Sequence, residues 1–449
     1  MRAIRQVVRK LDHQNRLIAD QGCAWTERLL ESLTGSVLNE FQEGLWYQLA
    51  ETEHHIRALK RREKRRKRRW NRFPKPDREA AEARDQHLQY MEKRRLVLEE
   101  RRRILRELGD ACAWTVLRAD SRNIRPLYSG SRTHQTPDGI GAIGPLSVMR
   151  EANASGKFLA LNADLTRYLG IGDLVIVPAE ILWVRPMVFE VKTRREGDDV
   201  AIWLIGFRPA LPTEEEILAE FSRTTGFEVY PPFPLREREA RQAQEIQDGS
   251  AHALDLWHRI ASVLPTSGEI HWRVMEQVLT RARQDGFAFD AIEEGIFYAA
   301  VRNAPGDDSE WLTSKCLRRI TGAGIALTNF HMFSSLELHF SGELSSVVLP
   351  IPLWNLPREL RVSLLNEEIY LHSIIHRSVW QRAFQQHRIG WLEEKGWWRL
   401  SRGKRHMALD PMETVKLRIN VAFSALSPGV IAQNIAQALN KPEAADESR

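Results

Sequence analysis

The fold of the central part of the chain is decided by two short apolar runs that carry acid, Gly172-Asp173-Leu174-Val175-Ile176-Val177 and Met187-Val188-Phe189-Glu190-Val191-Lys192-Thr193. Short runs rich in β-branched and aromatic residues predict β-strands. Side chains alternate along a strand, so Glu190 and Lys192 share one face while Phe189 and Val191 take the other. The pattern therefore predicts an acid and a base side by side on one strand, next to a strand that begins with Asp173. Such a pair could bind a metal ion and a phosphate together.

The whole chain sets the broad class. Its 449 residues are too many for one ordinary core, so we expect about two or three domains. The three cysteines, Cys23, Cys112 and Cys316, are far apart and odd in number, which argues against a disulfide framework and a four-ligand zinc site. The N-terminus has no apolar signal region, and no run approaches the ~18–20 apolar residues of a membrane helix. We expect a cytoplasmic protein that does not enter a membrane.

The first part of the chain, up to about residue 118, has a helical pattern. Apolar residues follow helical spacing from Trp25 to Leu59 and again from Asp77 to Leu108. Pro74 and Pro76 lie between the two stretches, and two prolines that close cannot continue a helix. The sequence therefore predicts two long antiparallel helices joined by a proline turn, a helical hairpin that we assign to residues 1–99.

The tip of this hairpin is strongly basic. Between Arg57 and Lys75 there are twelve Lys and Arg residues against one acid, Glu63. A charge run is usually a solvated face, and such a run could also be a nuclear localisation signal. This density, with Trp70 and Phe73 at its end, instead favours phosphate binding. The expected nucleic-acid-binding residues are Lys60, Arg61, Arg62, Lys64, Arg65, Arg66, Lys67, Arg68 and Arg69.

The rest of the chain divides into a region rich in expected strands and a region that is expected to be mainly helical. Strands are expected at 158–161, 174–177, 181–184, 187–191 and 200–207, which makes a compact α/β unit. Beyond residue 211 we expect helices at 250–265, 270–284, 288–302, 357–388 and 411–439, with a β-rich patch at 336–352. The expected fold class is α+β multidomain. It comprises the hairpin, an α/β core at 100–225, and a mainly helical domain with a small β-rich insert at 240–440.

The acidic strands carry a family resemblance. Gly172-Asp173 opens one apolar strand, and sixteen residues later Glu190-Val191-Lys192 lies inside another. This arrangement resembles the PD-(D/E)XK nuclease superfamily, the restriction-endonuclease-like fold, over about residues 100–225. Gly172 stands where the family has proline, and a glycine can also turn the chain sharply into the strand. A second Glu-x-Lys, at Glu393-Glu394-Lys395, has polar surroundings and no preceding Asp strand, so it is left out of the match.

The resemblance implies a role for each residue. Asp173 and Glu190 would bind a divalent metal, Mg²⁺ or Mn²⁺, with the Val191 carbonyl as a further ligand, since these ions prefer hard oxygen donors. Lys192 would position or deprotonate the attacking water and stabilise charge on the phosphate. The family also places an acid on the helix before the sheet. Glu107 and Asp110 are the candidates, and we favour Asp110 because small residues around it allow a close approach to the sheet.

Two functions follow as expectations. The first is a metal-dependent nuclease that hydrolyses phosphodiester bonds of DNA, as an effector of a bacterial anti-phage defence system. It would act as a homo-oligomer or as a subunit with protein partners of a defence complex. The second is a non-enzymatic nucleic-acid-binding scaffold whose nuclease-like core is inert. DNA binding that needs residues 57–75 but ignores Asp173 would favour the scaffold.

Overall fold

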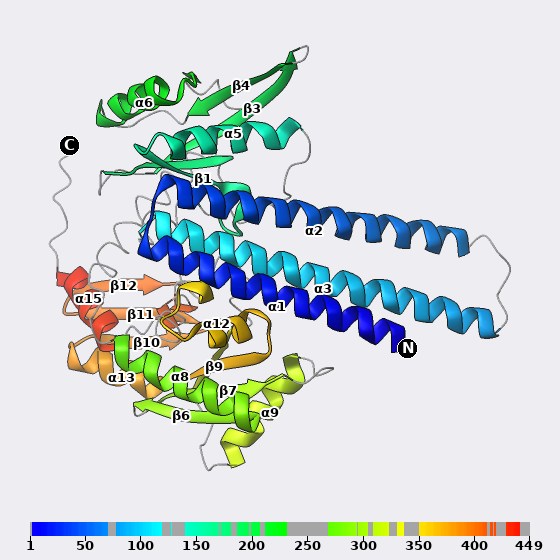
Figure 1. The fold of residues 1–449 in the computed structure, drawn as a ribbon. Helices are drawn as coiled ribbons and strands as arrows, with labels where there is room; N and C mark the ends of the chain where they lie inside the picture. The colour runs from blue at the N-terminus through cyan, green and yellow to red at the C-terminus, as the bar shows by residue number, and fades with distance from the viewer. Residues whose placement is uncertain are drawn as a thin grey trace. The chain divides into compact units, whose positions relative to one another are not determined.

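The chain forms two compact units that combine helices and sheets, an α+β architecture (Figure 1). One unit comprises Met1–Leu235 with Pro350–Leu353, and the other comprises Arg236–Leu349 with Trp354–Arg449. The computed structural model describes residues 2–70, 78–118, 127, 140–169, 172–180, 186–196, 199–206, 212–230, 268–293, 295–303, 309–322, 330–335, 350–410, 414–415, 417–418 and 428–440. The proline turn at 71–77, the strand expected at 181–184, the helix expected at 250–265 and most of the 336–352 patch lie outside these residues.

Three long helices, not two, build the N-terminal part: α1 (Arg2–Glu31), α2 (Gly35–Trp70) and α3 (Arg78–Val116). The helical pattern that begins at Trp25 is therefore interrupted at residues 32–34, where Thr34 accepts hydrogen bonds from Val37 and Leu38 and starts α2. α3 continues through residue 99, so the domain boundary expected there falls inside an unbroken helix. Figure 1 shows α2 and α3 side by side, with α1 along α3.

The contacts between α2 and α3 are of different kinds at the two ends of the helix pair. Near the body of the unit they are apolar, and Ile56, Leu59 and Leu98 form a small buried cluster. Towards the end of α2, Trp70 contacts Arg84 and His87 of α3, with the Arg84 guanidinium 4.7 Å from the Trp70 ring centroid. The far end of the hairpin is thus held by aromatic and cationic side chains, while its outer surface remains charged.

A five-stranded sheet forms the α/β part of the same unit, in the order β1-β2-β3-β4-β5. The strands are β1 (Phe158–Asn162), β2 (Leu174–Pro178), β3 (Met187–Glu196), β4 (Asp199–Gly206) and β5 (Val229–Tyr230). The first four pair antiparallel, and β5 pairs parallel to β4 after the crossover helix α6 (Pro212–Thr225). The strands predicted at 158–161, 174–177, 187–191 and 200–207 are confirmed within the described residues.

One face of this sheet is buried beneath α6 and α5 (Ile140–Ala154). The core between them includes Phe189 and Val191 of β3, Phe221 of α6 and Met149 of α5. Phe189 stacks on Phe221 with ring centroids 5.5 Å apart. Because Phe189 and Val191 point into this core, the residues that alternate with them, Glu190 and Lys192, point to the opposite face.

Two side-chain amides form hydrogen bonds with the backbone of β1, the strand at the edge of the sheet. Gln42 of α2 donates to the Ala160 carbonyl at 2.8 Å and accepts from the Asn162 N–H at 2.8 Å. Asn153 of α5 accepts from the Ala160 N–H at 2.7 Å. The free backbone groups of an edge strand can pair with a strand of another chain. In β1, the edge strand of this sheet, these amides form hydrogen bonds with the backbone groups of Ala160 and Asn162 instead.

The second unit contains two antiparallel sheets rather than a small β-rich insert. The first has the order β6-β7-β9-β8, formed by β6 (Phe287–Glu293), β7 (Ile296–Arg302), β8 (Phe330–Ser334) and β9 (Ile369–His376). The helices predicted at 288–302 and across 369–376 are therefore wrong. The expected helix at 270–284 is confirmed as α8 (Gly268–Asp285), and α9 (Ser309–Gly322) and α12 (Arg358–Leu365) are further helices described in this unit, while η3 (Ile351–Leu353) belongs to the first unit.

The second sheet follows α13 (Arg377–Gln386) and has the order β10-β11-β12. Its strands are β10 (Gly390–Glu394), β11 (Trp397–Arg402) and β12 (Arg405–Leu409), and α15 (Pro428–Asn440) packs against β11 and β12. A cluster of aromatic rings, Trp380, Phe384, Trp391 and Trp398, joins α13 to this sheet. The Glu393-Glu394-Lys395 copy of the motif begins at the end of β10.

The cysteines and the possible membrane-spanning helices are the subject of two further expectations. Cys23, Cys112 and Cys316 are all buried as free thiols. Among the helices that the structure describes, none joins the length and the apolar character needed to cross a lipid bilayer.

Candidate metal site

Asp173 is held in place at the start of β2. Gly172 before it has a φ of +67°, a conformation that side chains rarely tolerate, and this turns the chain into the strand. The Asp173 N–H donates to the Phe189 carbonyl at 2.8 Å, and its carbonyl accepts from the Ala163 N–H at 3.0 Å. Its side-chain Oδ2 accepts from the Val191 N–H at 2.7 Å. The carboxylate of Asp173 is therefore tied to β3, next to Glu190.

Glu190 and Lys192 lie together on β3, as predicted. The Lys192 ammonium is 2.5 Å from Glu190 Oε1, and the two side chains are 57% and 32% exposed. The register pairs Val175 with Val188, and alternation from that pair puts Asp173 on the same face as Glu190 and Lys192. Two carboxylates and one ammonium thus meet on two neighbouring strands, within reach of solvent.

Trp203 of β4 is a neighbour of this group that the sequence pattern did not single out. The β3–β4 register pairs Lys192 with Trp203 and Glu190 with Ile205. Directly opposed residues of an antiparallel pair lie on the same face, so the half-buried indole stands beside Lys192. The strand at 200–207 was predicted, but only its register against β3 identifies Trp203 as part of the group.

Substituting Gly172 tests how firmly Asp173 is positioned. A Cβ at Gly172 would lie 2.7 Å from the Phe189 carbonyl oxygen, whereas a Cβ at Gly156, with a similar φ of +70°, would meet nothing within 4 Å. Gly156→Ala should cost about 1 kcal/mol for the left-handed backbone alone. Gly172→Ala should cost roughly 1–3 kcal/mol more, because the neighbouring strand must move. Chemical denaturation measures both losses, and equal losses would contradict this description of the turn.

Asp110, the favoured third acid, has a different set of contacts. It is fully buried on α3, and both of its carboxylate oxygens accept from Arg167. The Arg167 backbone N–H donates to Oδ1 at 2.7 Å, and its Nε donates to Oδ2 at 2.5 Å. Glu107, the other candidate, is also buried, 3.5 Å from Arg103 and 3.8 Å from Arg167. These contacts anchor α3 to the segment after β1, which is a structural role.

The charges in this buried group depend on one another. Burial raises the pKa of Asp110 to about 6, although Arg167 favours the ionised carboxylate. Burial lowers the pKa of Arg167, but its attraction to Asp110 and Glu107 outweighs that effect and raises the pKa overall. A second buried ion pair joins Arg106 of the same helix to Glu53 of α2 at 3.1 Å, and Arg106 also donates to the Asp164 and Thr166 carbonyls.

The oxygen donors at the strand pair suit one kind of metal. In the residues that the structure describes, no three His, Cys, Asp or Glu side chains lie close enough together to hold a metal ion by themselves, so Asp110 does not join Asp173 and Glu190 in such a group. A closed cage for Zn²⁺ or Ca²⁺ therefore has no counterpart there. Mg²⁺ differs, because it keeps several waters and is often held by one or two carboxylates together with substrate phosphates. Asp173 and Glu190 fit that requirement.

The basic residues predicted to bind nucleic acid form the outer surface of α2. All nine, from Lys60 to Arg69, are exposed. Lys67 pairs with Glu63 at 2.6 Å and Lys60 with Glu99 of α3 at 3.4 Å. Nine exposed cations within ten positions of α2 give this face of the hairpin a positive potential.

The acidic strand pair and the basic helix are the two features from which a function can be argued. Searches of family models, of curated proteins and of solved structures found nothing that matches this chain.

Proposed function

We propose that the protein is a metal-dependent nuclease that hydrolyses phosphodiester bonds of DNA. The observation that carries the proposal is the placement of Asp173, Glu190 and Lys192 on one face of the paired strands β2 and β3, opposite the buried core of the sheet. The likeness to the PD-(D/E)XK superfamily supports the same assignment. A role as an effector of bacterial defence against foreign DNA belongs to this proposal and rests on that likeness alone.

The proposed ligands are the Asp173 and Glu190 carboxylates and the Val191 carbonyl, with Mg²⁺ or Mn²⁺ as the ion. A bound ion of this kind lowers the pKa of a coordinated water and neutralises charge on phosphoryl oxygens. We leave Asp110 out of the ligand set, because Arg167 already takes both of its carboxylate oxygens.

The side chains around the two carboxylates have separate tasks in this proposal. Lys192 donates to a phosphate oxygen and stabilises the negative charge that develops there, since an ammonium in a fixed position does this without reorganisation. Trp203, beside it, offers an aromatic surface to a sugar or base. The exposed cations of α2 attract the DNA backbone irrespective of sequence.

Metal binding is the experiment that tests the proposed site. A ligand that binds only the folded state raises its melting temperature, so Mg²⁺ or Mn²⁺ should raise that of the full-length protein. Asp173→Ala and Glu190→Ala should each remove the shift. Glu216→Ala, which deletes an exposed carboxylate on α6, is the matched control and should keep it. A shift that survives in both site variants would exclude these residues as the ligands.

The hairpin should govern how DNA affinity depends on salt. Changing Lys64, Arg65 and Arg68 together to Gln removes three exposed cations, which should lower the slope of log affinity against log salt by about three. The control changes Arg318, Arg399 and Lys404 to Gln, an equal loss of charge on the other unit. Fluorescence anisotropy with a labelled duplex measures both slopes. If the two sets change the slope equally, the hairpin has no special role.

A non-enzymatic scaffold is the second candidate, and the exposed charge of α2 is the observation that favours it. In that case DNA binding would require the α2 cations, and metal would have no effect on the protein. The two measurements above therefore separate the candidates: the scaffold predicts the salt effect without the metal shift.

A further inference from the structure

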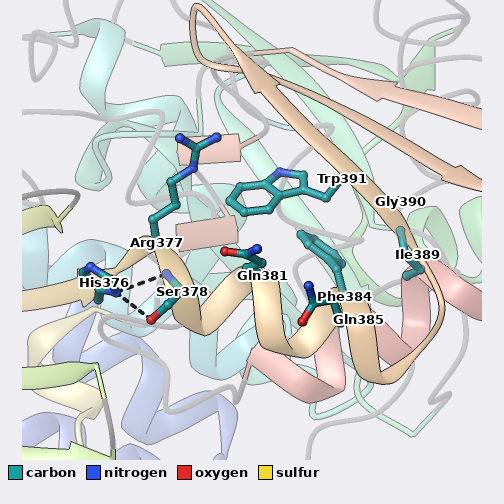
Figure 2. A pocket seen from close by; sticks show the side chains of 9 residues that line it. All are labelled: His376, Arg377, Ser378, Gln381, Phe384, Gln385, Ile389, Gly390 and Trp391. Carbon is teal, nitrogen blue, oxygen red and sulfur yellow. Dashed lines mark hydrogen bonds between the residues drawn. The ribbon is translucent and has the colours of Figure 1, made fainter.

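A hollow of about 530 Å³ opens between α13 and β10 in the second unit (Figure 2). Its size lies within the roughly 300–1,000 Å³ of small-molecule sites in proteins. Nine residues line it: His376, Arg377, Ser378, Gln381, Phe384, Gln385, Ile389, Gly390 and Trp391. The group combines aromatic rings, side-chain amides and a cation.

The charge of the hollow favours an anion. None of the nine lining residues is acidic, and Arg377 contributes a permanent cation. Arg377 pairs with Glu393 at 3.5 Å, and Arg418 also binds that carboxylate. Arg382 donates to Ser378 Oγ at 3.3 Å. Arg377 is therefore the cation of the lining, and it shares its carboxylate partner with Arg418.

One end of the hollow is lined by the polar residues His376, Arg377 and Ser378. His376 caps α13, where its Nδ1 accepts from the Ser378 N–H at 3.2 Å and lies 2.6 Å from Ser378 Oγ. Because Nδ1 acts as an acceptor, the neutral ring carries its proton on Nε2, which is a donor. Figure 2 shows His376, Arg377 and Ser378 together at this end, apart from Ile389 and Gly390 at the other.

The rest of the hollow suits a flat group with polar edges. The Trp391 ring lies across from α13, with the Arg377 guanidinium 5.0 Å from its centroid and the Phe384 ring at 5.7 Å. Gln381 and Gln385 are one turn apart on the same face of α13. Neither amide bonds to another residue that the structure describes, and each offers both donors and an acceptor.

We propose that this hollow binds a nucleotide, with the phosphate at the His376 and Arg377 end and the base against Trp391, where Gln381 and Gln385 contact its edge. An anion joined to a planar ring with hydrogen-bonding edges is the ligand chemistry that satisfies all three features. It occurs both in a free mononucleotide and at the end of a nucleic-acid strand. The proposal does not depend on the nuclease assignment, because these residues belong to the other compact unit.

Calorimetric titration of the full-length protein tests the proposal. The probes are AMP, GMP, CMP, dTMP, inorganic phosphate and a 5′-phosphorylated tetrathymidylate, in an Asp173→Ala background so that no probe is cut. At least one nucleotide probe should bind more tightly than inorganic phosphate. The double variant Gln381→Ala with Gln385→Ala should bind it about tenfold more weakly, as expected for the loss of two hydrogen bonds. Gln386→Ala, an exposed neighbour outside the hollow, should bind like the parent protein.

Each outcome has a defined meaning. Tighter binding of dTMP than of the tetranucleotide identifies a free nucleotide as the ligand, and the reverse order identifies a strand end. The proposal is overturned if no nucleotide binds, if inorganic phosphate binds as tightly as every nucleotide, or if the double variant keeps the parent affinity. Arg377→Gln adds a second readout, since it should weaken nucleotide and inorganic phosphate together.

Discussion

Lys192→Met should lower the rate of metal-dependent DNA cleavage by about 10²–10³-fold, the usual loss when one fixed donor to a developing negative charge is removed. The ammonium lies on the open face of β3 beside Glu190, where a phosphate can reach it. Methionine keeps the length and apolar stem of the side chain but has no donor. Folding should be little changed, because the side chain is mostly exposed.

Arg194→Met is the matched control for this substitution. Arg194 is exposed, lies two residues further along β3 and shares the face of Lys192 by alternation. The substitution of Arg194 removes the same unit of charge from the same surface as the substitution of Lys192. The rates are compared at saturating DNA, so that binding differences do not enter. A similar loss in both variants would mean that surface charge, rather than the position of Lys192, determines the rate.

Arg167→Met should lower the free energy of unfolding by about 3–5 kcal/mol at neutral pH, because it leaves buried carboxylates without their partner. Asp110 is fully buried and both of its oxygens bind Arg167, while buried Glu107 lies 3.8 Å from the same guanidinium. This is a large part of the total stability of a typical domain.

The sign of the pH dependence follows from Asp110. Its pKa of about 6 in the fold exceeds the ~3.9 of an unfolded aspartate, so the folded state holds the proton more tightly. Loss of Arg167 raises the folded pKa further. The penalty of Arg167→Met should therefore be small near pH 4 and grow as the pH rises through 6.

Two controls accompany that measurement by urea denaturation. Adding Asp110→Asn to Arg167→Met removes the buried carboxylate that has lost its partner, and should restore part of the lost free energy of unfolding. Arg28→Met breaks an exposed pair with Glu40 and should leave the midpoint close to that of the parent protein, since exposed pairs contribute little. If Arg28→Met and Arg167→Met lowered the free energy of unfolding by the same amount, the buried network would not anchor α3.

The strands of the central sheet could be predicted because their signal is local. Runs such as Leu174 to Val177 are uniformly apolar and rich in β-branched residues, and alternation alone places Glu190 with Lys192. The region 287–302 shows the opposite case. Its alanines favour a helix, but Gly286 and Gly295 adopt positive φ, β6 pairs with β7, and β7 pairs in turn with β9, so both segments are strands.

The partners of the site residues could not be predicted, because they depend on contacts far apart in the chain. Arg167 meets Asp110 across 57 positions, and no local pattern marks that pair. Trp203 joins the site only through the exact β3–β4 register. Glu107 and Asp110 looked alike as candidate ligands, since both lie on one face of α3, and the tertiary contacts give both a structural role.

Cleavage of supercoiled plasmid DNA by the full-length protein tests the central claim most directly. The account predicts nicked or linear product with Mg²⁺ or Mn²⁺, none with a chelator, and none from the triple variant Asp173→Ala, Glu190→Ala and Lys192→Ala, which should still melt cooperatively. A triple variant that cuts as fast as the parent protein would contradict the account, because the strand pair would then have no part in the reaction.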